Sequence, residues 1–278
     1  MNKMPSAWFA AGWFLVAPLA FAAPFDQAFD HLYNFDFPGA HAILDAYIAK
    51  HPQESLPYAM RGSAYLFHEL DRLGILEGEF FADDKRIIEK KKLRPDPEVR
   101  TKFLRAVDDA QSRAKAVLAS NPNDHDALFA MCVTQGIATD YMALVERRQI
   151  ASLAAARLSN NYAQQLLRLD PQYYDAYLTA GLSEYLVGSL PFFIRWFVHF
   201  DNVSGSKEKG VNTLLTVARQ GRYLKPFAKI LLSIAYLRDK NPQRSRELMV
   251  ELSRQYPANP LFRKELGKLE SHLGAFAN

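Results

Sequence analysis

Three short stretches carry residues that could do chemistry, and each lacks part of what that chemistry needs. Residues 68–72 (HELDR) begin like the zinc motif H-E-x-x-H, but Arg72 stands where the second histidine ligand belongs. Residues 181–185 (GLSEY) offer a serine without the closing glycine of a nucleophile elbow, and they fall inside a predicted helix. Residues 204–207 (SGSK) lack the upstream glycine spacing of a phosphate-binding loop and are typical of a helix cap.

Histidine and cysteine usage adds no further chemistry. The seven histidines show no metal-ligand spacing. Cys132 is the only cysteine, so it cannot form an intramolecular disulfide. A reactive thiol is one interpretation of Cys132, but its position is equivalent to glycines elsewhere in the chain, which favours a buried contact residue. We therefore expect no catalytic residue, no metal, no cofactor and no enzymatic activity.

A regular spacing of small residues and prolines predicts the elements that must hold any site. Four times, a small residue is followed twelve positions later by a proline and ten positions after that by another small residue. The four sets are Ala40/Pro52/Gly62, Ala110/Pro122/Cys132, Ser159/Pro171/Gly181 and Ser245/Pro257/Gly267. Before Pro52, apolar residues recur at helical spacing, as at Ala40, Ile43 and Leu44. The pattern predicts helices that touch through small side chains, with a proline in the turn between pairs.

This spacing resembles the tetratricopeptide (TPR) repeat. Residues 58–65 (YAMRGSAY) are similar to the TPR pattern W-x2-L-G-x2-Y, with Tyr58 in place of tryptophan and Arg61 as a departure. The resemblance implies an all-α, TPR-like solenoid of about five helix-turn-helix repeats, plus a C-terminal capping helix near residues 259–272. It implies a single domain over residues 23–278. The composition agrees, since 49% of the residues are hydrophobic and only 13 are glycines.

The N-terminus predicts export from the cytoplasm. Lys3 precedes an apolar run from about residue 7 to residue 21, and Ala20 and Ala22 are small residues of the kind that signal peptidase requires. We expect residues 1–22 to be a cleaved signal peptide, with an uncleaved anchor as the alternative, and a periplasmic or secreted protein. No cysteine stands directly after the apolar run, where lipid attachment would require one, so a lipoprotein is not expected. The formal net charge of +4 does not indicate nucleic-acid binding.

Three intervals in the spacing are longer than the 12 residues that separate Ser233 from Ser245. Gly62 to Ala110 spans 48 residues, Cys132 to Ser159 spans 27 and Gly181 to Gly210 spans 29. Each excess falls between the two helices of one pair, and in a solenoid those turns emerge on the same edge. We therefore predict three insertions on one edge, which is where elaborated loops of repeat proteins commonly bind.

The first two insertions differ in character. The first, at about 70–99, contains six basic residues between positions 85 and 94. These residues indicate either a patch for anionic lipid or an acidic partner, or a solvated charged helix ended by prolines. The second insertion contains neither proline nor glycine over 137–169, which predicts that both helices of that pair are lengthened by about two turns.

The third insertion is aromatic, with the sequence LPFFIRWFVHF at 190–200. Read as a helix from Pro191, it places its aromatic residues on one side and Arg195 with His199 on another. It is too short to span a bilayer. Three interpretations remain open: a lid on the repeat core, a wall of an apolar ligand pocket, or a helix that docks on a membrane surface or a partner.

A concave groove is the other predicted binding surface. The TPR positions that line such grooves fall mostly on apolar residues here, and the Lys/Asn/Arg clamp of chaperone-type TPR domains is absent. Because an open apolar groove would aggregate, we expect the third insertion, a ligand or a partner to cover it. The candidate binding residues of the groove and the insertion are Phe67, Phe129, Asp175, Tyr185, Phe193, Arg195, Trp196, Phe197 and His199.

Further resemblances concern the C-terminal third. Residues 190–210 and the stretch 256–262 (YPANPLF) resemble a type of secreted bacterial TPR protein, and more distantly fungal outer-membrane TPR proteins linked to inclusion-body clearance. The periplasmic TPR-like subunit of tripartite (TRAP) transporters is comparable in export, helix pairs and apolar interior. These resemblances imply a scaffold or adaptor for a protein partner in the cell envelope. The alternative is a carrier of an apolar or amphipathic small ligand in the groove.

Overall fold

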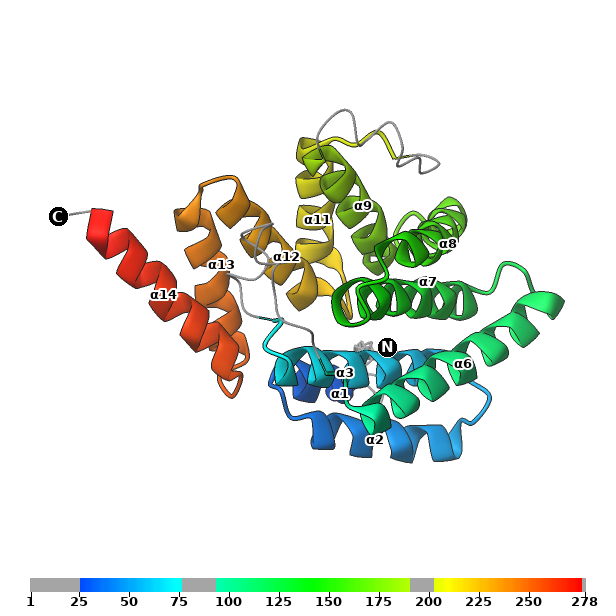
Figure 1. Cartoon of the computed structure of the whole chain (residues 1–278). Helices are drawn as coiled ribbons and strands as arrows, with labels where there is room; N and C mark the ends of the chain where they lie inside the picture. The colour runs from blue at the N-terminus through cyan, green and yellow to red at the C-terminus, as the bar shows by residue number, and fades with distance from the viewer. Residues whose placement is uncertain (1–25, 77–93, 191–202, 277–278) are drawn as a thin grey trace, which may run out of the picture.

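A computed structural model describes residues 26–76, 94–190 and 203–276 of the chain, and these residues are all-helical (Figure 1). These residues form eleven α-helices, of which ten pack in consecutive pairs, as expected for an all-α fold. The pairs are α1 (Asp26–Tyr33) with α2 (Phe37–Lys50), α3 (Leu56–Arg72) with α6 (Pro97–Ser120), α7 (His125–Asp140) with α8 (Gln149–Leu169), α9 (Tyr177–Ser189) with α11 (Lys207–Gln220), and α12 (Lys225–Arg238) with α13 (Pro242–Gln255). The unpaired helix α14 (Pro260–Phe276) follows.

Local capping explains where several helices begin. Asp96 accepts hydrogen bonds from the backbone N–H groups of Glu98 and Val99, and Pro97 occupies the first turn of α6. Ser206 accepts a hydrogen bond from the N–H of Lys209 and so caps α11. The prediction that residues 204–207 form a helix cap is confirmed.

The two helices of a pair run antiparallel. The Ser159 hydroxyl in α8 donates to the Cys132 carbonyl in α7 at 2.8 Å, and Gln165, further along α8, donates to the Pro122 carbonyl just before α7 begins at 3.1 Å. In the pair α7 and α8, the turn at 121–124 and the connection 146–148 therefore lie at opposite ends. We use the name insertion edge for the described ends of the three predicted insertions, residues 73–76, 94–96, 146–148, 190 and 203–206, with the helix ends that flank them.

Small residues bring the paired helices together. A Cβ atom on Gly181 would lie 3.1 Å from the Leu214 backbone nitrogen in α11, and one on Gly62 would lie 3.6 Å from a side-chain carbon of Val107 in α6. Gly267 is the exception, because a Cβ atom there would meet nothing within 4 Å. Helix α14 packs against α13, but among the described residues no second helix follows α14 as α11 follows α9, so the Gly267 position faces open space.

The second insertion is built as predicted, by longer helices. Beyond Asp140, α7 continues through a π-helical turn, Tyr141–Val145, and α8 is 21 residues long, whereas α2, α11, α12 and α13 have 14 residues each. The π-helical turn itself was not predicted. In the described part of the chain, His125–Val145 is the one helical stretch long and apolar enough to cross a membrane. It packs against α3, α6 and α8, and we interpret it as a core helix.

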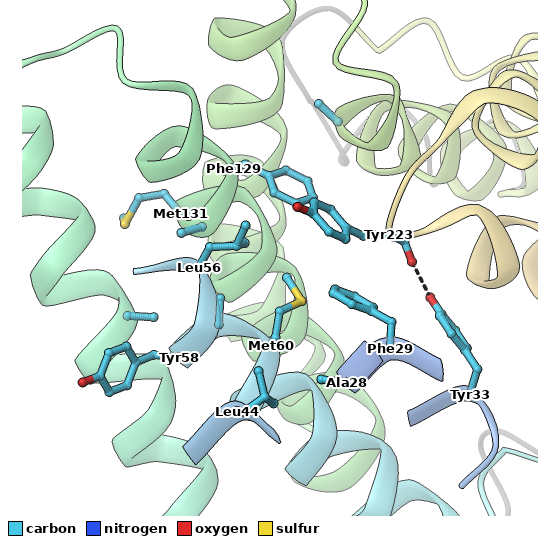
Figure 2. Packing of buried hydrophobic residues seen from close by; sticks show 14 of the residues in the cluster. Ala28, Phe29, Tyr33, Leu44, Leu56, Tyr58, Met60, Phe129, Met131 and Tyr223 are labelled. Atoms are coloured by element: carbon cyan, nitrogen blue, oxygen red, sulfur yellow. Dashed lines mark hydrogen bonds between the residues drawn. The ribbon is translucent and has the colours of Figure 1, made fainter. Parts of the chain in front are cut away.

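One buried cluster joins the first helix to the last ones. Figure 2 shows the part of this cluster in which Phe29 and Tyr33 lie beside Tyr223. Phe29 and Tyr33 of α1 belong to the same cluster as Tyr223, in the turn between α11 and α12, and Tyr256, in the turn before α14. The Tyr33 and Tyr256 ring centroids are 5.3 Å apart. The start of the described chain is therefore packed against its C-terminal third.

Candidate functional site

The four groove residues that the structure describes are covered to different degrees. The exposed fractions of Phe129, Asp175 and Tyr185 are 0%, 4% and 4%, so these three are interior residues. Phe67 is half-buried, and its ring meets that of Phe227 edge-on at 5.4 Å. The groove prediction identified positions on the inner face of the helices, but three of the four side chains have almost no surface to offer a ligand.

Helix α1 covers the predicted groove next to Phe129. The Phe29 ring stacks on Tyr223 at 4.9 Å, and Tyr223 lies 6.2 Å from the Phe129 ring. The Tyr33 hydroxyl donates to the Tyr223 carbonyl at 3.0 Å (Figure 2). Sequence reasoning looked for a cover in the third insertion, a ligand or a partner and overlooked α1. The available signal was the pair Phe29 and Tyr33, four residues apart and therefore on one face of a helix.

Asp175 positions the turn that α1 contacts. Its carboxylate accepts the backbone N–H groups of three consecutive residues, Arg222, Tyr223 and Leu224, at 2.8 to 3.2 Å. Burial raises the pKa of Asp175, and the three N–H groups act in the opposite direction. Its observed role is to hold Tyr223 under α1, because its hydrogen-bonding capacity is directed at the protein's own backbone.

The insertion edge also depends on buried carboxylates. Glu69, near the end of α3, is fully buried and accepts two hydrogen bonds from Arg72, each at 2.8 Å. It also accepts the N–H of Asp96 at 2.8 Å, while Arg72 donates to the carbonyl of Arg94 at 2.7 Å. The first connection therefore returns to the helices at a fixed point, immediately before α6. In the stretch 68–72 (HELDR), Glu69 and Arg72 therefore have a structural role, which is to hold the end of the first connection.

Glu184 holds the end of the third connection in the same manner. It is 3% exposed, and its carboxylate accepts the backbone N–H groups of Ser204, Gly205 and Ser206 at 2.8 to 3.1 Å. The Ser204 hydroxyl and the Lys209 ammonium also donate to it. Burial raises the pKa of Glu184, but these donors outweigh burial and lower it from 4.5 to about 2.

We expect Glu184→Gln to destabilise the fold by about 2–3 kcal/mol. The NH2 group of glutamine cannot accept the hydrogen bonds that one carboxylate oxygen now accepts, and the neutral side chain leaves the Lys209 ammonium without its counter-charge. The pKa of Glu184 is lower in the folded state than in the unfolded state. Its stabilisation is therefore fully present above about pH 4.5 and is lost as the pH falls toward about 2. Urea unfolding followed by circular dichroism between pH 2 and 7 measures both effects.

Glu251→Gln is the matched control for Glu184→Gln. Glu251 pairs with Lys229 at 2.8 Å but is 57% exposed, so its loss is expected to change stability by less than about 0.5 kcal/mol. If both variants lose the same stability, or if Glu184→Gln keeps the acid-dependent loss of the wild type, the anchoring role of Glu184 is wrong.

Ion pairs link neighbouring connections along the insertion edge. Arg100, at the start of α6, pairs with Glu146 in the second connection at 2.8 Å. Lys207, at the start of α11, pairs with Asp239 at the end of α12 at 3.4 Å. The first and second connections are thus adjacent, and the third is adjacent to the turn between α12 and α13.

The remaining candidate residues fall on the third insertion. Phe193, Arg195, Trp196, Phe197 and His199 lie outside the described residues, as does most of the basic run of the first insertion. Their predicted roles therefore stay predictions. What the structure adds is the anchoring of both insertions at their C-terminal ends.

Cys132 is a contact residue, as predicted. It is 2% exposed, and its Sγ lies 3.3 Å from the Thr179 hydroxyl, between α7 and α9. Burial raises the pKa of its thiol, which disfavours the reactive thiolate. Within residues 26–76, 94–190 and 203–276, no three His, Cys, Asp or Glu side chains gather as a metal site would require.

Comparison with known proteins adds no relative. A scan against protein-family models finds no matching family, and a search of curated proteins finds no match.

Proposed function

We propose that this protein is a non-enzymatic, TPR-type scaffold of the cell envelope that binds a protein partner through its insertion edge. The observation that carries the proposal is the anchoring of two long connections by buried carboxylates, Glu69 and Glu184. Burying a carboxylate is costly unless it is fully hydrogen-bonded. Two such groups hold the C-terminal ends of these connections, residues 94–96 and 204–206, at fixed points, and a binding surface requires such fixed supports.

Export and the repeat class belong to the same proposal. The sequence 1–22 supports passage into the periplasm or beyond, and the five antiparallel helix pairs support a TPR-type array. A carrier that holds an apolar ligand in the groove is less well supported. Helix α1 already occupies the inner face next to Phe129, so a ligand there would have to displace Phe29 and Tyr33.

Site-specific photocrosslinking in the native host tests the scaffold proposal. Ile150, beside the second connection, is 88% exposed and suits replacement by a photoreactive amino acid. We expect it to yield an adduct of discrete mass with an envelope protein. Asn123, exposed in the turn between α6 and α7 on the opposite edge, is the control and is expected to yield none. No adduct at Ile150, or equal adducts at both positions, would refute binding at this edge.

A further inference from the structure

Two adjoining hollows lie on the surface of the fourth helix pair. One has a volume of about 540 Å³ and lies between the start of α9 and α11, and the other, of about 300 Å³, extends toward α8. Tyr177, Lys209 and Thr213 line both, so the two open hollows adjoin, and we refer to them together as the α9–α11 groove. Both volumes fall within the range of small-molecule sites.

The larger hollow offers two aromatic rings and no aliphatic side chain, whereas Leu167, Ala180 and Val203 are among the residues that line the smaller one. Tyr174 and Tyr177 are half-buried, with ring centroids 6.5 Å apart and planes inclined by 28°. The side chains opposite come from α11 and carry hydroxyl, amide or charged groups. A lipid or another wholly apolar ligand would leave these polar groups without partners, which disfavours that class.

The charges around the groove balance. Lys209 is bonded to Glu184, so its charge is compensated within the protein. Glu208 lines the larger hollow and Arg168 the smaller one, and their charges are opposite. Phosphate and nucleic-acid sites instead gather positive charge to compensate the ligand. The groove therefore favours a ligand without net charge.

The polar groups match a ligand that is rich in hydroxyls. Thr213 donates its hydroxyl hydrogen to the Lys209 carbonyl and Thr216 donates to the Asn212 carbonyl, at 2.8 and 3.2 Å. Both oxygens keep lone pairs that can accept from a ligand, and the exposed amide of Asn212 can donate and accept. Ligand hydroxyls, which also donate and accept, complement this set.

We propose that this groove binds a neutral oligosaccharide. A sugar ring presents an apolar C–H face that can lie on Tyr174 or Tyr177 and a rim of hydroxyls that the α11 side chains can bond. The groove reaches the insertion edge at Val203 and Ser206, but the proposal does not depend on that edge binding a protein.

Saturation-transfer NMR on the full chain tests the proposal, with N,N′,N″-triacetylchitotriose, maltotriose and cellotriose as neutral probes. We expect at least one to bind with a dissociation constant of about 1 mM or tighter. Transfer should be strongest to ring hydrogens on the sugar face that meets tyrosine. Tyr174→Ala and Asn212→Ala should each weaken binding about tenfold or more, because they remove the ring contact and the amide.

Asn123→Ala, on the opposite edge, is the matched control and should bind like the wild type. Circular dichroism melting shows whether each variant is folded, and Asn212 is exposed enough for its replacement to be tolerated. Absence of transfer to all three sugars would overturn the proposal. So would undiminished binding by both folded variants, or tighter binding of adenosine monophosphate than of any neutral probe.

Discussion

Gly210→Ala is expected to destabilise the protein by about 3 kcal/mol, although it adds a single methyl group. A Cβ atom at position 210 would lie 2.6 Å from the backbone nitrogen of Tyr185 and 2.8 Å from the carbonyl oxygen of Gly181. Both contacts are with the backbone of α9, which cannot rotate away as a side chain would. The helices α9 and α11 would have to separate along their closest approach, which costs packing over the whole pair.

Gly267→Ala is the control for the same substitution at a helical glycine. A Cβ atom at 267 meets nothing within 4 Å, so only the higher helix propensity of alanine acts, and a gain of up to about 1 kcal/mol is expected. Urea unfolding of the two variants and the wild type gives both numbers. Similar stabilities for the two variants would mean that α9 and α11 do not approach as closely as described.

The two glycines also show how far the spacing of small residues could predict the fold. It predicted the helix before Pro52, the solo helix near 259–272 and the packing role of Cys132, because these depend on local periodicity and on size alone. It did not separate Gly267 from Gly181. That difference depends on whether a partner helix follows, which the residues around each glycine do not encode.

The contacts that close the groove were not predictable in this way. Phe29 meets Tyr223, and Glu184 meets the backbone of residues 204–206, across sequence separations that no helical period connects. Asp175 illustrates the consequence. Its groove position in the repeat is compatible with ligand binding, but its carboxylate is occupied by backbone N–H groups from residues 222–224. Only the spatial arrangement distinguishes a ligand-binding carboxylate from a structural one.

Asn259→Ala is expected to cost about 3 kcal/mol, because this fully buried side chain ties the first helix pair to the last helix. Its Oδ1 accepts the N–H of Leu261 at 2.9 Å and so caps α14. Its Nδ2 donates to the Tyr33 carbonyl, at the end of α1, at 2.7 Å. Loss of the cap accounts for about 1 kcal/mol, and the buried Tyr33 carbonyl left without a donor accounts for the rest.

Asn241→Ala separates the two contributions. Asn241 caps α13 through the N–H of Arg244 at 3.2 Å, but it is exposed, so its replacement is expected to cost only about 1 kcal/mol. Hydrogen exchange supplies a second measurement. Because α1 is held by Tyr33 and its neighbours, amides in residues 26–36 should exchange faster in Asn259→Ala and unchanged in Asn241→Ala. Equal costs and equal exchange would mean that α1 stays on the inner face without this bridge, held by the stacking of Phe29 on Tyr223 alone.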